Sequence, residues 1–365
     1  MSSTNTLKTP KLFSKIQFLG VSLLMSGLCL GLTACTSKKQ EEKPSKELNL
    51  AIWANYLSPE MQEKFTKETG IKLIISNYTS NEELLAKVQA GASGYDVAVP
   101  SDYMVDIMVK QGMLHDLQAD KIPNKANLNP DFLSQEFDPE NKYSLPYSWL
   151  TAGIAVHRDI FKGTISSWTE LFANKELDGK ISLLDDVREV LSTALKKNGY
   201  SVNTTKKEEL DKAQTDLKAF RKKVKMFRTD TIDPLVAKEV AVAHAYSSDA
   251  LQAAEKSGGK IEYILPVEGG TRSIDNLVIL KNAKNVEAAH QLINFLLTPE
   301  ANVAFVKAIK AGPVLKQTRD LLPDNLKNNP ALFPPSDSLK KFERLKDLGE
   351  TTAVYDRLWT ELKVE

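Results

Sequence analysis

The chain contains very little cysteine. Only Cys29 and Cys35 occur among its 365 residues, and both lie close to the N-terminus. The sequence after residue 35 therefore has no thiol with which to form a disulfide, even in an oxidising compartment. Its stability has to come from a hydrophobic core, which a composition of 42% apolar residues can supply.

Features that mark other classes of protein are missing as well. The 48 Lys and Arg residues are balanced by 47 Asp and Glu residues, so the chain lacks the basic field that nucleic acid attracts. It contains no Gly-x-Ser-x-Gly nucleophile elbow, and its histidines lack metal-ligand spacing such as His-Glu-x-x-His. We expect no nucleic-acid partner, no metal and no cofactor. We expect structural or surface positions for the four histidines, with His244 buried in a strand: His115, His157, His244 and His290.

The first 35 residues have the pattern of a secretory signal. Lys8, Lys11 and Lys15 precede an apolar run over residues 18–32, which is short for a membrane span. The run ends in Leu32-Thr33-Ala34-Cys35, which resembles a bacterial lipobox. We therefore expect residues 1–34 to be a lipoprotein signal peptide, Cys35 to carry acyl chains that hold the protein at a membrane, and residues 35–47 to form a polar tether. An ordinary signal peptide with an incidental cysteine is the alternative.

Strand and helix patterns alternate after this segment. Strands are predicted over residues 48–53, 71–78 and 96–100, separated by helices over 59–69, 80–91 and 104–112. Short connections between alternating strands and helices indicate a parallel sheet covered by helices. The pattern then repeats before a mainly helical C-terminal region, with strands over 153–156, 180–184, 240–246, 261–265 and 277–280 and helices over 167–172, 187–197 and 210–221. Two such sheets indicate an α/β protein with two lobes.

Ligands of open parallel sheets bind beyond the carboxyl ends of the strands. These ends carry residues 53–56, 101–103, 185, 186 and 189, 246–249 and 273–275, from which the candidate residues are selected. The candidates are aromatic, hydroxyl and carboxylate side chains, and basic residues are sparse among them. Carboxylates neutralise ammonium groups and ring faces attract them, so the set predicts a site for an organic cation. The candidates are Trp53, Tyr56, Ser101, Tyr103, Asp186, Glu189, Tyr246 and Asp275.

Each candidate also has an ordinary structural explanation. Trp53 and Tyr246 could be core aromatics, and Glu189 could complement the dipole of the helix that begins at Val187. We expect Asp185 to cap this helix, which would leave Asp186 for a ligand. Asp275 could pair with Arg272 or with a lysine. Their joint position at strand ends favours the functional interpretation.

The sequence resembles the spermidine/putrescine-binding proteins of polyamine ABC importers over nearly the whole chain after the signal. A specific block is Asp185-Asp186-Val187-Arg188-Glu189-Val190, and the others are residues 65–72, 95–101, 137–139, 203–205, 268–270 and 292–297. The resemblance implies a two-lobed, type II periplasmic-binding-protein fold that closes on its ligand. It also implies interlobe crossings near residues 146–149, 269–275 and 312–316. The first lobe would comprise residues 48–150 and 275–318, and the second 151–274 and 319–365.

The resemblance assigns roles to the candidate residues. Trp53, Tyr56, Ser101 and Tyr103 match ligand contacts of the first lobe. Asp186 and Glu189 match an acidic pair that holds a terminal amine, Asp275 matches the carboxylate of an inner amine, and Tyr246 replaces a tryptophan. The sequence departs from the family pattern at other contact positions, where it has Ala54, Asn55, Ser273, Ala311 and Leu345.

Three functions are compatible with these observations. The leading hypothesis is a lipoprotein that captures spermidine or putrescine and delivers it to the membrane subunits of an ABC permease. The second is a protein of the same fold for another small, cationic ligand, which the lost aromatic residues favour. The third is a lipid-anchored hydrolase that would use Asp186 and Glu189 as acid and base.

Overall fold

The computed structural model describes residues 46–54, 56–91 and 94–364. The predicted signal peptide, Cys35, nearly all of the tether and Asn55 lie outside the described residues. The description below concerns the described part of residues 44–365, which form one compact unit.

The first third of this unit alternates strands and helices as predicted. Helix α1 begins where the Ser58 side chain accepts a hydrogen bond from the backbone N–H of Met61 at 3.3 Å, with a proline in its first turn. It ends at Gly70, whose φ of 72° lies in the left-handed region that favours glycine. The elements are β1 (Glu47–Trp53), α1 (Pro59–Thr69), β2 (Lys72–Tyr78), α2 (Asn81–Gln89), β3 (Val97–Ala98) and α3 (Asp102–Lys110).

A long strand leads into the second set of elements. Three short 3-10 helices (Ala119–Lys121, Pro123–Asn127 and Pro130–Phe132) precede β4 (Ser144–His157), of which the sequence predicted only the end. Strand β6 was missed altogether. The elements that follow are α4 (Trp168–Ala173), a 3-10 helix (Lys175–Leu177), β5 (Ile181–Leu183), α5 (Val187–Lys197), α6 (Lys207–Arg221), β6 (Val224–Phe227), α7 (Ile232–Val236), β7 (Val242–Tyr246), α8 (Ser247–Lys256) and β8 (Ile261–Ile264).

The remainder is mainly helical after one more strand, as predicted. Among the described residues no single helix combines the length and apolarity that a membrane crossing needs, and only α9 with α10 does so as a pair bent by 72°. The elements are β9 (Arg272–Ile279), α9 (Val286–Leu296), α10 (Pro299–Ile309), α11 (Thr318–Leu321), α12 (Asp324–Lys327), 3-10 turns at Ser336–Leu339 and Gly349–Thr351, and α13 (Thr352–Val364).

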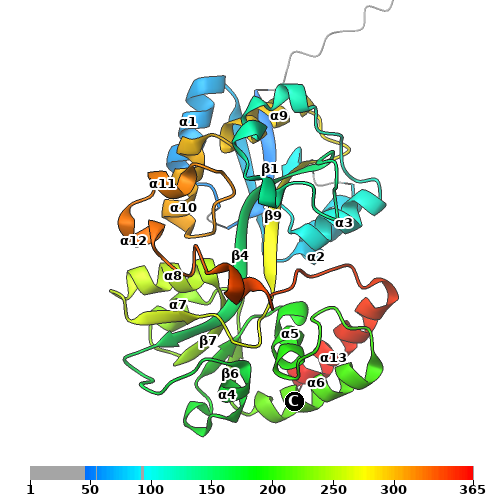
Figure 1. Cartoon of the computed structure of the whole chain (residues 1–365). Helices are drawn as coiled ribbons and strands as arrows, with labels where there is room; N and C mark the ends of the chain where they lie inside the picture. The colour runs from blue at the N-terminus through cyan, green and yellow to red at the C-terminus, as the bar shows by residue number, and fades with distance from the viewer. Residues whose placement is uncertain (1–45, 55, 92–93, 365) are drawn as a thin grey trace, which may run out of the picture. The chain divides into compact units, whose positions relative to one another are not determined.

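The strands follow the order β2-β1-β3-β9-β4-β7-β5-β6, with β8 paired to β4. Each end of this order is a parallel block: β1 pairs parallel with β2 and β3, and β5 pairs parallel with β6 and β7. Between them lie the long strands β4 and β9, which pair antiparallel with each other and extend through both halves of the molecule (Figure 1). The two predicted lobes are therefore joined through shared strands, which confirms the two-lobed α/β fold and makes each sheet mixed rather than wholly parallel.

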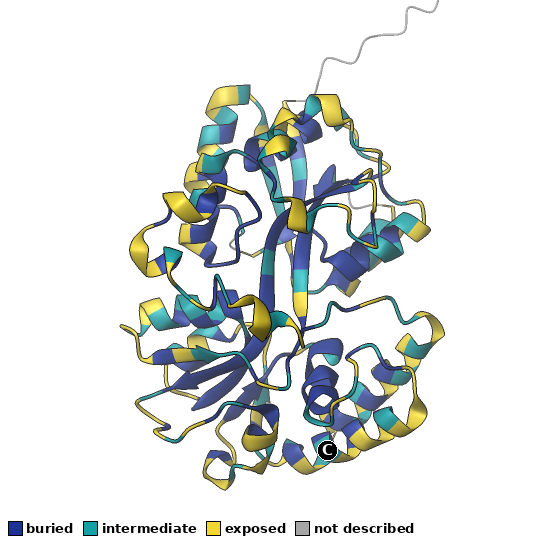
Figure 2. Cartoon of the chain, viewed as in Figure 1, coloured by how far each residue is buried: buried dark blue, intermediate teal, exposed yellow. Residues whose placement is uncertain are grey.

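Each parallel block has its own hydrophobic core. The first core lies around β1, α1, α9 and α10, and the second lies around β5, α5 and α6. The strands of both lobes are buried, whereas the outer helices are exposed on one face (Figure 2). Leu322, Leu326 and Leu332 belong to the first core, and α13 packs on the second through Tyr355 and Leu358. We therefore propose that the chain returns to the second lobe after residue 332 rather than near residue 319.

The segments expected to cross between the lobes lie side by side. Ser148 on β4 pairs with Asp275 on β9, and the next residue, Trp149, exchanges two backbone hydrogen bonds with Gly312 at 3.1 and 2.8 Å. The Trp149 ring lies against Gly312 so closely that any side chain there would collide with it. This contact explains why the chain needs glycine at this point.

Candidate ligand-binding site

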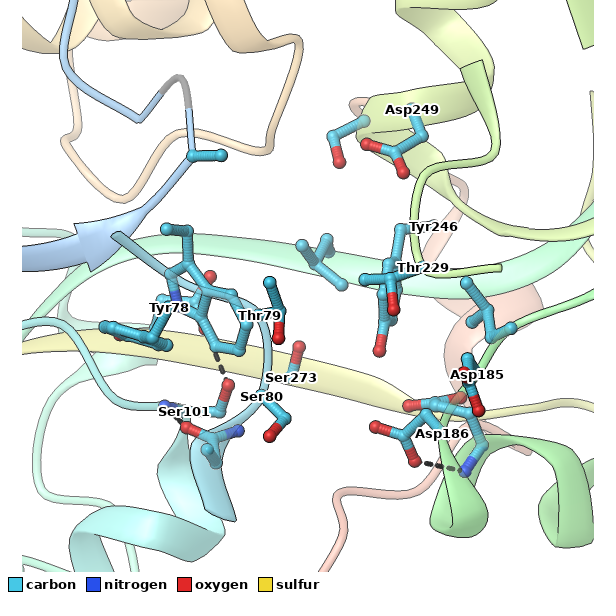
Figure 3. Close-up of a pocket in the computed structure, with 18 of the residues that line it drawn as sticks. Tyr78, Thr79, Ser80, Ser101, Asp185, Asp186, Thr229, Tyr246, Asp249 and Ser273 are labelled. Carbon is cyan, nitrogen blue, oxygen red and sulfur yellow. Dashed lines mark hydrogen bonds between the residues drawn. The ribbon is translucent and has the colours of Figure 1, made fainter. Parts of the chain in front are cut away.

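The carboxyl ends of the parallel strands from both lobes surround one cavity of about 310 Å³. The structure brings all the residues predicted from strand ends to its wall. Figure 3 shows first-lobe residues such as Tyr78 and Ser101 on one side and second-lobe residues such as Asp186 and Tyr246 opposite them. The predicted residues that line the cavity are Trp53, Tyr56, Ser101, Tyr103, Asp186, Glu189, Tyr246 and Asp275.

The charge of this wall has one sign. Among the described residues that line the cavity there is no lysine, arginine or histidine. Three of its carboxylates, Asp102, Glu189 and Asp275, are buried, and buried carboxylates are costly unless they take up protons or a cation. The wall therefore has the chemistry of a site for a positively charged ligand. Its acidic residues are Asp102, Asp185, Asp186, Glu189, Asp230, Asp249 and Asp275.

Asp275 is the central carboxylate of the first-lobe wall. It is 3% exposed and accepts hydrogen bonds from the hydroxyl groups of Ser101 at 2.8 Å, Tyr56 at 2.9 Å and Ser148 at 3.3 Å. Burial raises the pKa of Asp275 to about 6, and the three donated hydrogen bonds limit this rise. These hydroxyl groups, rather than Arg272 or a lysine, hold the carboxylate in place.

The aromatic residues of this wall are held by hydrogen bonds and by ring contacts. The indole N–H of Trp53 donates to the carbonyl oxygen of Val99 at 2.9 Å, and its ring contacts that of Tyr78 with 4.6 Å between centroids. The Tyr103 hydroxyl donates to Glu82 at 2.8 Å. Trp53 thus packs on the first core, as its structural explanation required, and also presents a ring to the cavity. The two interpretations of this residue are compatible.

The prediction that Asp185 caps helix α5 and leaves Asp186 free for a ligand is wrong. Helix α5 begins at Val187, so its N-cap is Asp186, whose Oδ1 accepts the backbone N–H groups of Arg188 at 2.8 Å and Glu189 at 3.0 Å. Asp185 lies one residue before the cap, is exposed and pairs with Lys363 at 2.6 Å. Both capping bonds reach the same oxygen of Asp186, so capping occupies only half of this carboxylate.

Glu189 completes an acidic pair with Asp186 on the first turn of α5. It is 4% exposed, and its Oε2 accepts a hydrogen bond from the Thr271 hydroxyl at 2.6 Å. The buried ring of His244 lies 3.8 Å from the same oxygen, and burial lowers the pKa of His244 to about 3, so this histidine is neutral. Burial raises the pKa of Asp186 and of Glu189, and the charge of Asp186 raises that of Glu189 further. A cation bound next to the pair would therefore stabilise the ionised forms of both carboxylates.

Several lining residues were not among the predicted ones. Asp249 lies on the first turn of α8, where burial raises its pKa to about 7 and the Thr231 hydroxyl donates to it at 3.2 Å. Thr229 and Asp230 follow β6, and this strand was missed because its sequence, Val-Lys-Met-Phe, is short and carries an exposed lysine. Asp249 was among the residues expected at strand ends, but it was not selected as a ligand contact.

The departures from the family pattern fall in two environments. Ala54, Ser273 and Leu345 line the cavity, and from the resemblance we had expected a tryptophan at position 273 and a glutamine at position 345. Ala311 is fully buried in the first core and is not part of the described lining, and Asn55 lies outside the described residues. Three of these substitutions therefore lie in the wall of the cavity.

The fold and this cavity define a class of protein. In the described part of the chain no group of three or more His, Cys, Asp or Glu side chains is arranged to hold a metal. Two α/β lobes on shared strands, with an acidic and aromatic cavity between them, are typical of binding proteins that enclose a small ligand. The chain matches the family described as bacterial extracellular solute-binding protein over residues 60–334, and it belongs to this family.

Individual relatives are similar over nearly their whole length. The spermidine/putrescine-binding periplasmic protein of Salmonella typhimurium is 38% identical over 93% of this chain and 97% of its own, and that of Escherichia coli K12 is 37% identical with the same coverage. Among solved structures, the spermidine/putrescine ABC transporter substrate-binding protein PotD of Streptococcus pneumoniae has a TM-score of 0.77 at 31% identity, covering 88% of this chain and 99% of its own. The TpPotD lipoprotein of Treponema pallidum has a TM-score of 0.80 at 26% identity, covering 87% and 100%.

Proposed function

We propose that this protein captures a polyamine, spermidine or putrescine, in the cavity between its lobes and delivers it to the membrane subunits of an ABC permease. The observation that carries the proposal is the wall of buried carboxylates with no basic lining residue among those described. The names of relatives at 37–38% identity support the ligand class.

The two walls supply complementary contacts for such a ligand. The Asp186–Glu189 pair would hold one terminal ammonium group, and Asp275 would receive a second amino group on the opposite side. Trp53, with Tyr246 opposite, would cover the methylene chain between them and attract the charged ends through their ring faces. Charge on both walls would also draw the lobes together around a bound dication.

Calorimetric titration of the purified protein tests this proposal directly. Spermidine and putrescine should bind with micromolar or tighter dissociation constants. The matched control is a neutral diol with the carbon chain of putrescine, which has the same methylenes and no positive charge, and it should not bind measurably. Binding of the diol as tight as that of putrescine would contradict a site built for cations, and the absence of binding by any polyamine would contradict the proposed ligand.

A second candidate ligand is a bulkier organic cation. Ser273 and Leu345 in the lining favour it, because they widen one part of the wall and remove a polar contact. Titration with spermine and with basic amino acids, in the same series, distinguishes this candidate from spermidine and putrescine. Recovery of every ligand unchanged after long incubation is expected, because we propose that the protein binds without turnover.

We also propose that Cys35 is lipidated and tethers the protein to the outer face of a membrane. The lipobox-like sequence at residues 32–35 supports this, as does the name of the lipoprotein relative from Treponema pallidum. Cys35→Ala should leave the protein unprocessed or released from the membrane fraction. Metabolic labelling with a palmitate analogue checks this, and incorporation that persists in Cys35→Ala would contradict it.

A further inference from the structure

The segment that leads into α13 runs between the two halves of the molecule (Figure 1). Its residues 343–347, which we call the strap, have the sequence Glu-Arg-Leu-Lys-Asp. Leu345 lines the ligand cavity, whereas the four charged residues are not part of its described lining. The ligand site therefore gives no reason for the charges of the strap.

The backbone of the strap is bound to the second lobe. Glu343 donates its N–H to the carbonyl oxygen of Gly270 at 3.0 Å and accepts the N–H of Arg272 at 2.9 Å, as in a parallel pair of strands. The side chain of Asn203 donates to one carbonyl group of the strap and accepts one of its N–H groups, each at 2.8 Å. The Glu343 carboxylate also accepts a hydrogen bond from Lys196 on α5 at 2.5 Å. We therefore expect the strap to move with the second lobe.

Charged side chains of the strap extend to the first lobe. The Lys346 ammonium lies 2.9 Å from the carboxylate of Glu136, in the loop before β4. The carboxylate of Asp347 lies 3.1 Å from the ammonium of Lys110, at the end of α3. Each of these ion pairs joins one residue of the strap to one residue of the first lobe.

Leu345 joins the strap to the first lobe through apolar contacts. It is 8% exposed and belongs to a hydrophobic cluster with Tyr103 and Met104 of α3. The other second-lobe member of this cluster is the fully buried Val202, and the remaining buried members lie within residues 51–114 and 278–280 of the first lobe. Apolar contacts and ion pairs across the boundary between the lobes stabilise the arrangement that brings both sides together.

We propose that the strap fastens the two lobes to each other around a bound ligand and so slows the release of that ligand. The inference rests on the proposed function and adds a determinant of affinity outside the cavity. If the lobes open by moving apart, they have to break the contacts of the strap as well as those of the ligand. Glu136, Lys110, Lys346 and Asp347 are then positioning residues, which act on the ligand through the lobes and do not touch it.

Charge reversal at the Glu136–Lys346 pair tests this, because both side chains are exposed and neither is part of the described cavity lining. Glu136→Lys places two ammonium groups opposite each other, and Lys346→Glu places two carboxylates there. Each variant should raise the dissociation rate of spermidine about two- to tenfold, as expected when an exposed ion pair becomes a repulsive pair. Stopped-flow fluorescence measures this rate, and thermal unfolding checks that each variant is folded.

The two reversals distinguish the strap from a general effect of charge. Lys346→Glu makes the protein more acidic, which by itself would favour a cationic ligand, so faster release from this variant is not explained by net charge. The double variant Glu136→Lys/Lys346→Glu restores a pair of opposite charges. Its dissociation rate should return to within about twofold of the wild-type rate, because the two residues are coupled.

The matched control is Asp116→Lys. Asp116 forms an exposed ion pair with Lys142 at 3.2 Å, and both residues belong to the first lobe. The variant changes the net charge by the same amount as Glu136→Lys but leaves the contacts between the lobes intact. It should keep the dissociation rate of spermidine within about twofold of the wild-type rate.

The outcomes separate the two proposals. Binding of polyamines by the wild-type protein, with unchanged release from both single reversals or with no recovery in the double variant, overturns the role of the strap and leaves the proposed function intact. Slower release from Lys346→Glu, or an equal effect of Asp116→Lys and Glu136→Lys, also overturns it. Failure of the wild-type protein to bind any polyamine overturns both proposals.

Discussion

The two walls of the cavity carry the same charge but stabilise it differently. In the first lobe the carboxylate of Asp275 is surrounded by three hydroxyl donors that partly compensate its burial. In the second lobe Asp186 and Glu189 stand together on one helix turn, and Glu189 receives one hydroxyl donor from Thr271. Hydrogen bonds hold the carboxylate of the first wall in place without a ligand. In the second wall the two carboxylates, when ionised, repel each other unless a cation binds.

Because of this difference, we expect the two lobes to contribute differently to ligand binding. Preorganised hydroxyl groups fix the position of Asp275, so the first lobe can define where an amino group lies. We expect the second lobe to provide the larger gain on binding, because a cation would relieve the repulsion between its paired carboxylates. Substitutions in the two walls and changes of pH test this difference between the lobes, beginning with the substitution of largest expected effect.

The acidic pair of the second lobe should dominate affinity. Asp186→Asn removes one of its charges, while asparagine remains a good N-cap for α5, so the fold should persist. We expect the binding free energy of spermidine to weaken by about 2–5 kcal/mol, as measured when one member of a buried charge pair is truncated. Calorimetry gives the dissociation constant, and far-ultraviolet circular dichroism checks the fold.

The neighbouring residue provides the control for this change. Asp185→Asn removes a carboxylate from the same segment, but this one is exposed and paired with Lys363. Its effect should be below about 1 kcal/mol, which is typical of exposed ion pairs. Equal losses from the two variants would show that net charge, rather than the pair at the start of α5, determines affinity.

The raised pKa values predict that pH acts on binding and on stability in opposite directions. The pKa of Asp275 is about 6 and that of Asp249 about 7, both above the 3.8 of an unburied aspartate, so the ligand-free fold holds protons that the unfolded chain has released. The contribution of these groups to stability is therefore largest near pH 4 and declines as pH rises through 6–7. A cationic ligand prefers the ionised forms, so its affinity should rise over the same interval, by up to about tenfold per pH unit for each proton released.

Thermal unfolding with and without spermidine at pH 5 and pH 8 measures both effects. As far as these carboxylates contribute, the ligand-free protein should melt at a lower temperature at pH 8 than at pH 5. The increase in melting temperature that spermidine causes should be larger at pH 8. Asp275→Asn should flatten the pH dependence of binding. A ligand-induced increase that is the same at both pH values would contradict the assignment of protonated carboxylates to the empty site.

The smallest expected effect concerns the widened wall. Ser273→Trp adds a ring face to the cavity and should tighten polyamine binding by about 0.5–2 kcal/mol through cation–π attraction, provided the ring enters without a clash. The same change should block a bulkier native ligand. Titration with spermidine and putrescine compares these outcomes, and weaker binding of both polyamines would favour the bulkier ligand.

Local patterns were sufficient for most of the secondary structure. Ser58-Pro59 and Gly70 predicted the ends of α1 because capping depends on residues next to the helix. The error at Asp185 and Asp186 had the same local origin: a cap is defined by the first helical residue, and a shift of one position changes which side chain reaches the free N–H groups. Strand β6 was missed because only one of its four residues is fully buried, which leaves no clear hydrophobic period.

Local sequence patterns did not predict which strands and side chains pair when they are far apart along the chain. The sequence predicted the last residues of β4 and of β9, but not that these strands pair with each other and join the two sheets. Asp275 meets Tyr56 and Ser101 across more than 170 positions of sequence, and no periodicity encodes which hydroxyl groups will reach it.

The sequence by itself determined the class of fold, the strand ends at which a site could form and the cationic nature of its ligand. These follow from hydrophobic period, capping residues and the choice of side chains at a few positions, all of which act over short distances along the chain. Only the tertiary structure decided which carboxylates are paired and which are satisfied by hydroxyl groups. Burial and hydrogen bonding depend on residues brought together from both lobes, and they set the energy of each charge in the site.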